Sequence, residues 1–265
     1  MSKFPEPAAS FCDRHIGPSA VEQEAMLDAL KCDTLEELIA EVVPANLLSN
    51  EALRLPDPQC ESEALASLEE TMAKNVVATS FIGCGYSNTL TPPVIQRCVL
   101  ENPGWYTAYT PYQAEISQGR LEALLNYQTL ICELTAMPVA NASLLDEATA
   151  AAEVVSLAAA SKPKGKVFFV SERCYPQTID VLKTRAEPLD YELIISDPAH
   201  FDFAAHEGEV IGMLLQVPDE LGSLTWESSV VEACHAAGGL VVVAADLLSL
   251  CLITPPGESG ADIVV

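Results

Sequence analysis

Basic residues are scarce in this chain of 265 residues. It has 13 lysines and arginines against 38 aspartates and glutamates, which gives a net charge of −25 at pH 7. The acidic residues are spread along the chain and indicate a solvated surface. This balance argues against a nucleic-acid partner, because nucleic-acid binding rests on lysine and arginine side chains that neutralise phosphates.

Long apolar runs are also absent. No stretch approaches the roughly 18 consecutive apolar residues that a membrane-spanning helix needs. The first residues, Met-Ser-Lys-Phe-Pro-Glu-Pro, have neither the apolar core of a signal peptide nor an arginine-rich transit pattern. The sequence therefore predicts a cytoplasmic protein with no membrane partner. With 49% apolar residues, it can bury a sizeable core.

Metal-binding patterns are missing, and we expect no metal site. The two closest of the nine cysteines, Cys84 and Cys98, are 14 positions apart, so no zinc-ligand spacing exists. An odd number of cysteines without a secretion signal predicts reduced, mostly buried thiols. The four histidines form no His-x-x-His pair and are expected to cap helices or to make hydrogen bonds in the core. They are His15, His200, His206 and His235.

A helical arm is predicted at the start of the chain, over residues 1–60. The pairs Ser19 with Glu22 and Thr34 with Glu37 have the spacing of capping boxes that open short amphipathic helices. Pro44 is expected to end the second helix.

The domain predicted over 61–265 begins with a helix after the proline-rich loop 55–60. This helix carries Leu65, Leu68 and Met72 on one stripe. Further helices are expected from Thr91-Pro92 to about residue 102 and from Ser117, the second with one buried side.

Short apolar strands then alternate with helices. The expected strands are 139–142, 166–171, 191–195, 211–217 and 240–245, with another beginning in 260–265. The expected helices are 146–160, one from Pro176 and one from Glu227. This alternation predicts a mainly parallel sheet with helices on both faces. Gly83 and Gly85 lack the third glycine of a dinucleotide-binding loop, so a turn is the favoured interpretation there.

The most informative segment, Trp105–Arg120, reads WYTAYTPYQAEISQGR. With Phe81–Ile95 and Asn141–Glu153, it is similar to the signature of the glycine cleavage system P-protein (glycine decarboxylase) family. Weaker similarity at Asp13–Pro18 and Thr254–Val265 extends the resemblance over essentially the whole chain. Because members of the family are much longer, the resemblance is to an amino-terminal piece.

The resemblance implies an oxidoreductase of glycine catabolism. In that family, glycine is decarboxylated on pyridoxal 5'-phosphate (PLP), and its aminomethyl group passes to the lipoyl group of H-protein. The resemblance also implies two related halves of PLP fold type I, of which only the carboxyl-terminal one carries the catalytic lysine and the cofactor. The implied partners are that half, lipoylated H-protein and glycine, in a homo- or hetero-oligomer.

This chain offers only fragments of a PLP site. Asp246 follows the expected strand 240–245, where fold-type I enzymes place the aspartate that pairs with the pyridinium nitrogen. Asp146 and Glu147 open the helix whose amino end would hold the phosphate, and two carboxylates there would repel a dianion. No lysine follows Asp246 to form a Schiff base. The lysines are Lys3, Lys31, Lys74, Lys162, Lys164, Lys166 and Lys183, with 162–166 expected as a solvated turn.

The sequence therefore predicts an incomplete fold-type I major domain without catalytic or cofactor-binding residues, preceded by the helical arm. The missing lysine also argues against an independent PLP enzyme such as an aminotransferase. An alternative function is a structural and interaction subunit that completes the active site of a partner half. The family's usual His-Pro-Gln-Thr is Tyr175-Pro-Gln-Thr here, which leaves the role of that histidine open.

Two interpretations of the tyrosine-rich segment stay open. Its aromatic residues could be packed in an interface or core with their hydroxyls in water. Alternatively, four of its side chains reach across an interface and line the glycine and PLP pocket of the catalytic half. These four are Tyr109, Tyr112, Gln113 and Glu115.

Overall fold

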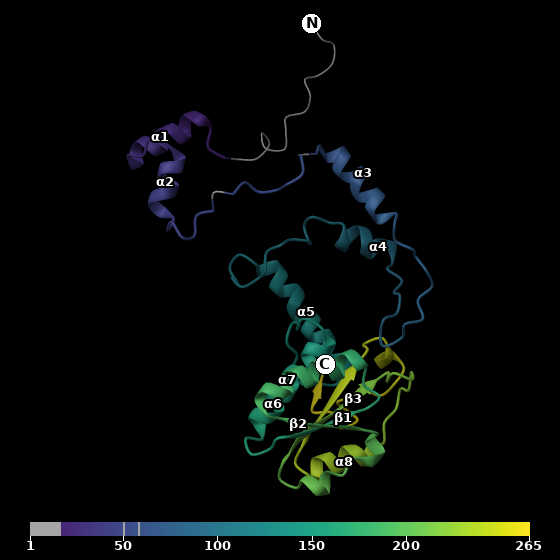
Figure 1. The fold of residues 1–265 in the computed structure, drawn as a ribbon. Coiled ribbons are helices and arrows are strands. Elements are labelled where there is room, and N and C mark those ends of the chain that lie inside the picture. The colour runs from purple at the N-terminus through teal and green to yellow at the C-terminus, as the bar shows by residue number, and fades with distance from the viewer. Residues whose placement is uncertain (1–16, 50, 58) are drawn as a thin grey trace. The chain divides into compact units, whose positions relative to one another are not determined.

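The computed structural model describes residues 17–49, 51–57 and 59–265 (Figure 1). His15, Cys12 and Lys3 therefore lie outside the described residues. The contacts divide the chain into two compact units, one ending at Thr79 and one beginning at Ser80. This division includes helix α3 in the first unit, whereas the predicted boundary preceded it. The assignment of separate roles to 1–60 and 61–265 stays a prediction.

The first unit contains helices α1 (Ala20–Leu30), α2 (Leu35–Val42) and α3 (Glu61–Met72). The capping box that opens α1 is confirmed: Ser19 Oγ accepts from the Glu22 amide, and the Glu22 carboxylate accepts from the Ser19 amide at 2.7 Å. Thr34 caps α2 by accepting from the Glu37 amide at 3.1 Å. The apolar stripe of α3, formed by Leu65, Leu68 and Met72, is exposed, and no residue of this helix is buried.

The second unit begins with extended chain and two helical segments. Helix α4 (Pro93–Ile95) continues as the π-helix η2 (Gln96–Leu100), and α5 covers Gln118–Thr135. The predicted start of α4 is wrong by one residue, since Pro92 and not Thr91 stands at the cap. The predicted start of α5 at Ser117 is confirmed.

Only Thr135 of α5 is fully buried, which corrects the prediction of a buried side. Four residues of its apolar stripe, Leu121, Leu124, Ile131 and Cys132, are half-buried, and Leu125 is exposed. The physical reason is that the spacing of apolar residues specifies a face but not the partner that covers it.

The second unit is built on a five-stranded, wholly parallel sheet in the order β2-β1-β3-β4-β5. This confirms the predicted α/β class. The strands are β1 (Val167–Ser171), β2 (Glu192–Ser196), β3 (Val210–Val217), β4 (Leu240–Ala245) and β5 (Ile263–Val264). The helices of this part are α6 (Glu147–Ser161), α7 (Pro176–Ala186) and α8 (Ser228–Ala236). Short 3₁₀ turns lie at η3 (Glu187–Leu189), η4 (Pro198–His200), η5 (Phe203–His206) and η6 (Ser249–Cys251).

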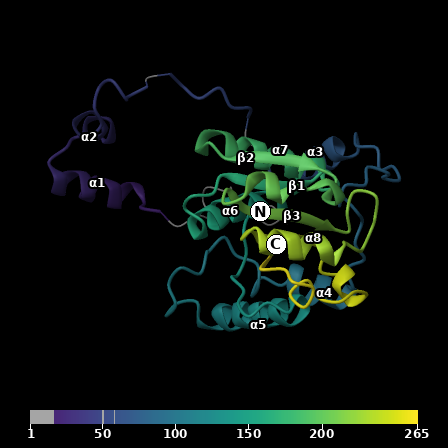
Figure 2. The same ribbon diagram turned by 90° about the horizontal axis from the view of Figure 1, so that it is seen from below.

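Helices cover both faces of the sheet, as predicted. Figure 1 shows α6 and α7 on one side of the strands and α8 on the other, and Figure 2 shows the same elements from below. Successive side chains of β1 alternate between the two cores: Phe168 packs with α6 and α7, and Phe169 with α8. Because both faces are covered, every residue of β1 and β3 is buried.

The segment 139–142, predicted as a strand, does not pair with the sheet. Instead, the Ala140 carbonyl accepts a hydrogen bond from Gln128 Nε2 of α5, at 2.8 Å. A short apolar run fits a strand by composition, but a strand also needs a neighbour whose backbone groups are free.

The eight described cysteines are free thiols, as predicted. The prediction that most are buried is wrong, because only Cys32, Cys174 and Cys234 are. Cys60, which directly precedes α3, and Cys98 of η2 are exposed, because these two helices bury no residue. Burial raises the pKa of the Cys174 and Cys234 thiols to about 12, so both are unreactive.

No helix among the described residues is long and apolar enough to cross a membrane.

Candidate functional site

Polar side chains gather where the parallel strands end, as in other open α/β sheets. Gln216 lies near the end of β3, and Asp246 directly follows β4, where its amide donates to the Val217 carbonyl at 2.9 Å. Glu147 comes to the same edge from the first turn of α6. We call the set Glu147, Tyr175, Gln216 and Asp246 the strand-end cluster.

Loop 83–86 packs against this edge. Gly83 and Gly85 have φ angles of +67° and +82°, which confirms the predicted turn. Gln177 Nε2 of α7 donates to the Cys84 carbonyl at 2.9 Å. A Cβ atom at Gly85 would lie 2.7 Å from Tyr175 Cε2, so only glycine lets the loop approach the tyrosine ring this closely.

Glu147 is a half-buried carboxyl among other acidic groups. Burial raises its pKa, and the nearby Asp246 and Asp146 raise it further, while a hydrogen bond from Gln216 opposes them. Asp146 differs: the Thr149 amide donates to its Oδ1 at 2.7 Å, and hydrogen bonding from Thr149 lowers its pKa. The amino end of α6 is therefore capped by its own carboxylate.

Tyr175, which stands in place of the family's usual histidine, belongs to the same cluster. Burial raises the pKa of its hydroxyl, and the carboxylates Glu147 and Asp246 raise it further. A phenol held neutral here cannot carry the positive charge that a histidine could acquire.

The strand-end cluster does not fit PLP. The cofactor's phosphate needs free backbone amides or cationic groups, whereas the amino end of α6 presents Asp146, already bonded to Thr149, and the half-buried Glu147. No lysine belongs to the cluster among the described residues. Lys166 pairs instead with Asp190, where β1 begins and β2 is about to begin. Of the groups that a PLP site needs, the cluster contains only Asp246, which directly follows β4 as the sequence predicted.

We expect the purified chain mixed with PLP to form no specific internal aldimine. The reason is that no lysine reaches the cluster and its carboxylates repel the phosphate. Borohydride trapping followed by peptide mapping checks this result: modification should be slow and scattered over exposed lysines. A stoichiometric visible band trapped on a single lysine would contradict the prediction.

The four tyrosine-segment residues predicted to line a pocket lie apart from the strand-end cluster in sequence and are all exposed. Tyr109 is 42% exposed and Tyr112 is 90% exposed. Within the described part of the chain, the side chains of Tyr109, Tyr112, Gln113 and Glu115 make no hydrogen bond or ion pair. Their polar tips are therefore free for another molecule.

The backbone around these residues is nevertheless held. Arg120, in the first turn of α5, donates to the Trp105 carbonyl at 2.8 Å and so closes the segment on itself. The Tyr109 amide donates to Thr107 Oγ1 at 3.2 Å, and the Tyr112 amide to the Thr110 carbonyl at 2.8 Å. These bonds fix the turn while its side chains stay exposed.

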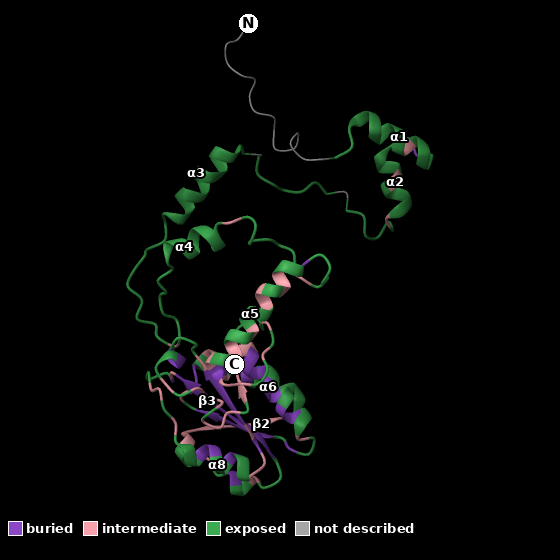
Figure 3. Ribbon diagram, turned by 180° about the vertical axis from the view of Figure 1, so that it is seen from behind, coloured by how far each residue is buried: buried purple, intermediate pink, exposed green. Residues whose placement is uncertain are grey.

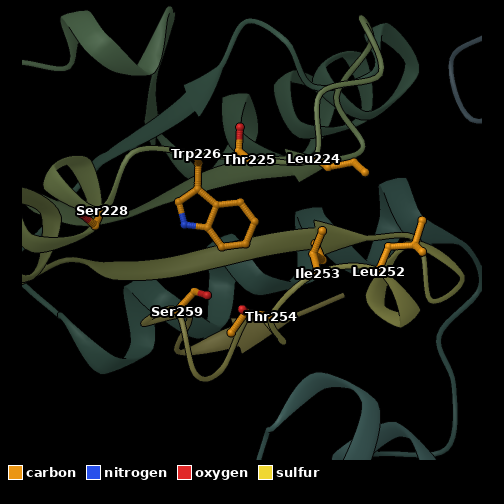
Figure 4. Close-up of a pocket in the computed structure, with 8 residues that line it drawn as sticks. All are labelled: Leu224, Thr225, Trp226, Ser228, Leu252, Ile253, Thr254 and Ser259. Carbon is orange, nitrogen blue, oxygen red and sulfur yellow. The ribbon is translucent and has the colours of Figure 1, made fainter.

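Two hollows were not predicted from the sequence. One, of about 500 Å³, lies between the start of α8 and the turn before β5, with the Trp226 indole beside several hydroxyl groups (Figure 4). The other, of about 610 Å³, is an apolar groove between α5, α6 and β5. The lining of the first contains hydroxyl groups but no Asp, Glu, His, Cys, Lys, Arg or Tyr, so it offers no acid or base to activate a hydroxyl. Neither hollow has a sequence signal, because each is lined from segments far apart in the chain.

The described histidines are distributed as isolated groups. His235 Nε2 lies 2.9 Å from Asp262 Oδ2, which also accepts from the Val241 amide, so this pair connects α8 to the start of β5. His206 packs edge-on against Phe169. No group of three potential metal ligands occurs within residues 17–49, 51–57 and 59–265.

Comparison with known proteins gives a consistent result. The family described as glycine cleavage system P-protein matches residues 13–265. The chain is 54% identical over 257 residues to a glycine dehydrogenase (decarboxylating) of a Nostoc species, covering 97% of this chain and 26% of that protein. It is 50% identical to the protein of the same name from Akkermansia muciniphila, covering 97% and 27%. The chain thus spans about a quarter of the length of these relatives.

A solved structure is similar over nearly the whole chain. It is the crystal structure of a glycine decarboxylase (P-protein) of the glycine cleavage system in inhibitor-bound form. The match has a TM-score of 0.83 and 35% identity, and it covers 94% of this chain and 57% of the solved one.

Proposed function

This chain belongs to the glycine cleavage system P-protein family, and on that premise we propose that it is the non-catalytic, amino-terminal part of a glycine decarboxylase. In the complete enzyme, PLP is bound by the carboxyl-terminal half, glycine is decarboxylated there, and the aminomethyl group passes to lipoylated H-protein. The observation that carries the proposal is the mismatch between the strand-end cluster and PLP, in a chain so similar to these relatives. The cytoplasmic location stays a prediction of the sequence.

The chain's contribution is to build and cover the partner half's active site. The tyrosine segment supports this role, since its backbone is fixed by Arg120 while Tyr109, Tyr112, Gln113 and Glu115 are exposed. We propose that these four side chains line the glycine and PLP pocket across the interface. Tyrosine hydroxyls and the Gln113 amide can orient a polar substrate, and the Glu115 carboxylate can attract a cationic amine.

An extended apolar surface supports the same partner. Phe81 is 92% exposed, and Ile82, Leu90 and Tyr112, which follow it along the chain, are exposed as well. Figure 3 shows most of the ribbon from loop 80–92 to the start of α5 in the exposed colour. Large apolar side chains gathered along one segment are typical of an interface. We propose that the carboxyl-terminal half is the occupant of this surface.

Reconstitution tests the proposed function. The chain is mixed with the complementary carboxyl-terminal portion of the Nostoc relative, PLP and lipoylated H-protein, and glycine-dependent CO2 exchange is measured. We expect exchange only when both parts are present. Exchange by this chain alone would contradict the proposal that it is non-catalytic. Full exchange by the carboxyl-terminal portion alone would contradict the proposal that this chain completes the active site.

Replacing Phe81 by alanine should weaken assembly of the two parts by about tenfold or more, because a buried aromatic anchor at an interface is worth over 1.4 kcal/mol. Titration of one part with the other measures this effect. Leu252→Ala, at an exposed residue outside the segment, is the matched control and should leave assembly unchanged. If the two substitutions weaken assembly equally, the surface around Phe81 is not the binding site of the carboxyl-terminal half.

A further inference from the structure

The apolar groove between α5, α6 and β5 has three carboxylates and no basic side chain among the described residues that line it. Two of the carboxylates have donors of their own. The Thr149 amide donates to Asp146 Oδ1 at 2.7 Å, and Arg185 of α7 pairs with Glu153. The third, Glu147, differs, because its buried Oε1 has no hydrogen-bond partner in the described chain. The groove therefore contains one carboxylate with an oxygen that lacks a donor.

A second acceptor without a donor is buried beside the groove. Gln216 is only 7% exposed, and its Oε1 has no partner in the described part of the chain, while its Nε2 donates to the Ala244 carbonyl at 3.2 Å. Because side chains alternate along a strand, Gln216 lies on the same face as Leu214, in the core that α6 covers. The next residue of β3, Val217, pairs with Ala245, which lines the groove. Two unpartnered acceptors therefore lie near the start of α6, and such burial is costly.

A cationic group with several N–H donors would satisfy both acceptors. Asp146 caps α6 next to Glu147, and Asp246 directly follows β4 at the same edge, so negative charge accumulates there. A guanidinium has five N–H donors and an ammonium has three, and rotation of the Glu147 carboxyl about its last bond can turn either oxygen to the groove. A metal ion fits less well, because the residues that the structure describes hold no group of three potential ligands.

The walls of the groove favour a peptide segment over a small hydrophilic cation. They carry exposed apolar side chains, among them Val139 and Leu157. Strand β5 lies at one end of the sheet order, so its side away from β4 has no neighbouring strand in the described chain. A second copy of this chain fits poorly, because each copy has a net charge of −25. The chain covers only 26% of the Nostoc relative, so most of a protein of that length lies outside the matched part.

We propose that the groove binds a segment of the P-protein's carboxyl-terminal portion, and that an arginine or lysine of this segment pairs with Glu147 and donates to Gln216 Oε1. The apolar residues of the segment pack on the walls of the groove. This contact is additional to the proposed surface around Phe81. The identity of the partner rests on the proposed function, whereas the chemistry of the missing group follows from the unpartnered acceptors in and beside the groove.

Glu147→Gln keeps the shape of the side chain and removes its charge, so it tests the inference through two measurements with opposite signs. Titration with the carboxyl-terminal portion of the Nostoc relative should show assembly weakened by at least about tenfold, because the arriving cation is left without its partner. In the chain by itself, the thermal midpoint should rise by about 2–4 °C, because a half-buried carboxylate without a cation is removed.

Glu153→Gln is the matched control. Glu153 lies on the same helix and lines the same groove, but it already pairs with Arg185. Its substitution should leave assembly unchanged and should not raise the midpoint of the chain by itself.

The outcomes separate this inference from the proposed function. Equal assembly of the unaltered chain and Glu147→Gln overturns the inference and leaves the proposed function intact. No assembly by the unaltered chain contradicts the proposed function and, with it, the occupant named for the groove. A lowered midpoint of Glu147→Gln overturns the inference whether or not the two parts assemble, because the carboxylate then has a stabilising partner within the chain.

Discussion

Tyr109→Phe should slow glycine-dependent CO2 exchange by about 10²–10³ in the enzyme completed with the family's carboxyl-terminal portion, because a hydroxyl aimed at charge developing in a desolvated pocket is worth that much. Folding should be barely affected. The hydroxyl makes no hydrogen bond in the described chain, and its removal in an interface costs about 0.5–1.5 kcal/mol if it forms an ordinary hydrogen bond there. Exchange in the presence of H-protein and the thermal midpoint are the two measurements.

Glu115→Gln should have the same signature, since it removes a charge and keeps the volume. The chain offers matched controls for both substitutions. Tyr127, on α5, is 42% exposed like Tyr109, so Tyr127→Phe removes an equivalent hydroxyl outside the segment. Glu122→Gln, on the same helix, removes an exposed carboxylate. Both controls should leave exchange within about twofold, the span of an effect below 0.5 kcal/mol.

The two open interpretations of the segment differ in what these variants lose. If Tyr109 and Glu115 only pack in an interface, the variants will show normal exchange with a lowered midpoint. If they line the pocket, exchange will fall with an unchanged midpoint. A loss of exchange equal to that of the Tyr127 and Glu122 controls would also count against the pocket.

Phe168→Ala should lower the free energy of unfolding of the chain by about 3–5 kcal/mol, the usual cost of removing a buried phenylalanine ring. Phe168 is 0% exposed on β1, where it packs against α6 and α7. Its loss leaves a cavity between the sheet and the helix that carries Glu147. Urea unfolding monitored by circular dichroism checks the magnitude.

Phe81→Ala is the control for this substitution, because it removes the same ring from an exposed loop. Its effect on unfolding of the chain by itself should stay within about 0.5 kcal/mol. A loss below 1 kcal/mol for Phe168→Ala would show that this core is not tightly packed. Together with the assembly measurement, Phe81→Ala also separates a residue that stabilises the chain from one that binds a partner.

The parallel α/β architecture was determined by local sequence. Apolar runs of the β3 and β4 type, separated by amphipathic helices, can bury both faces only in a sheet covered on both sides. Caps such as Ser19 and Asp146 set helix starts within a residue, since their hydrogen bonds reach only three positions along the chain. The sequence also shows that no lysine follows Asp246, because this observation requires only the order of the residues and not their positions in space.

Tertiary structure alone decided which faces are covered and which charges meet. The spacing in α5 predicted a buried side, and the helix packs only partly; the apolar run 139–142 finds no free strand to pair with. Glu147, Tyr175, Gln216 and Asp246 are separated by up to 99 positions along the chain, and only the shared end of the parallel strands unites them. Sequence patterns record local geometry and composition, whereas burial and proximity depend on the partner that each surface finds.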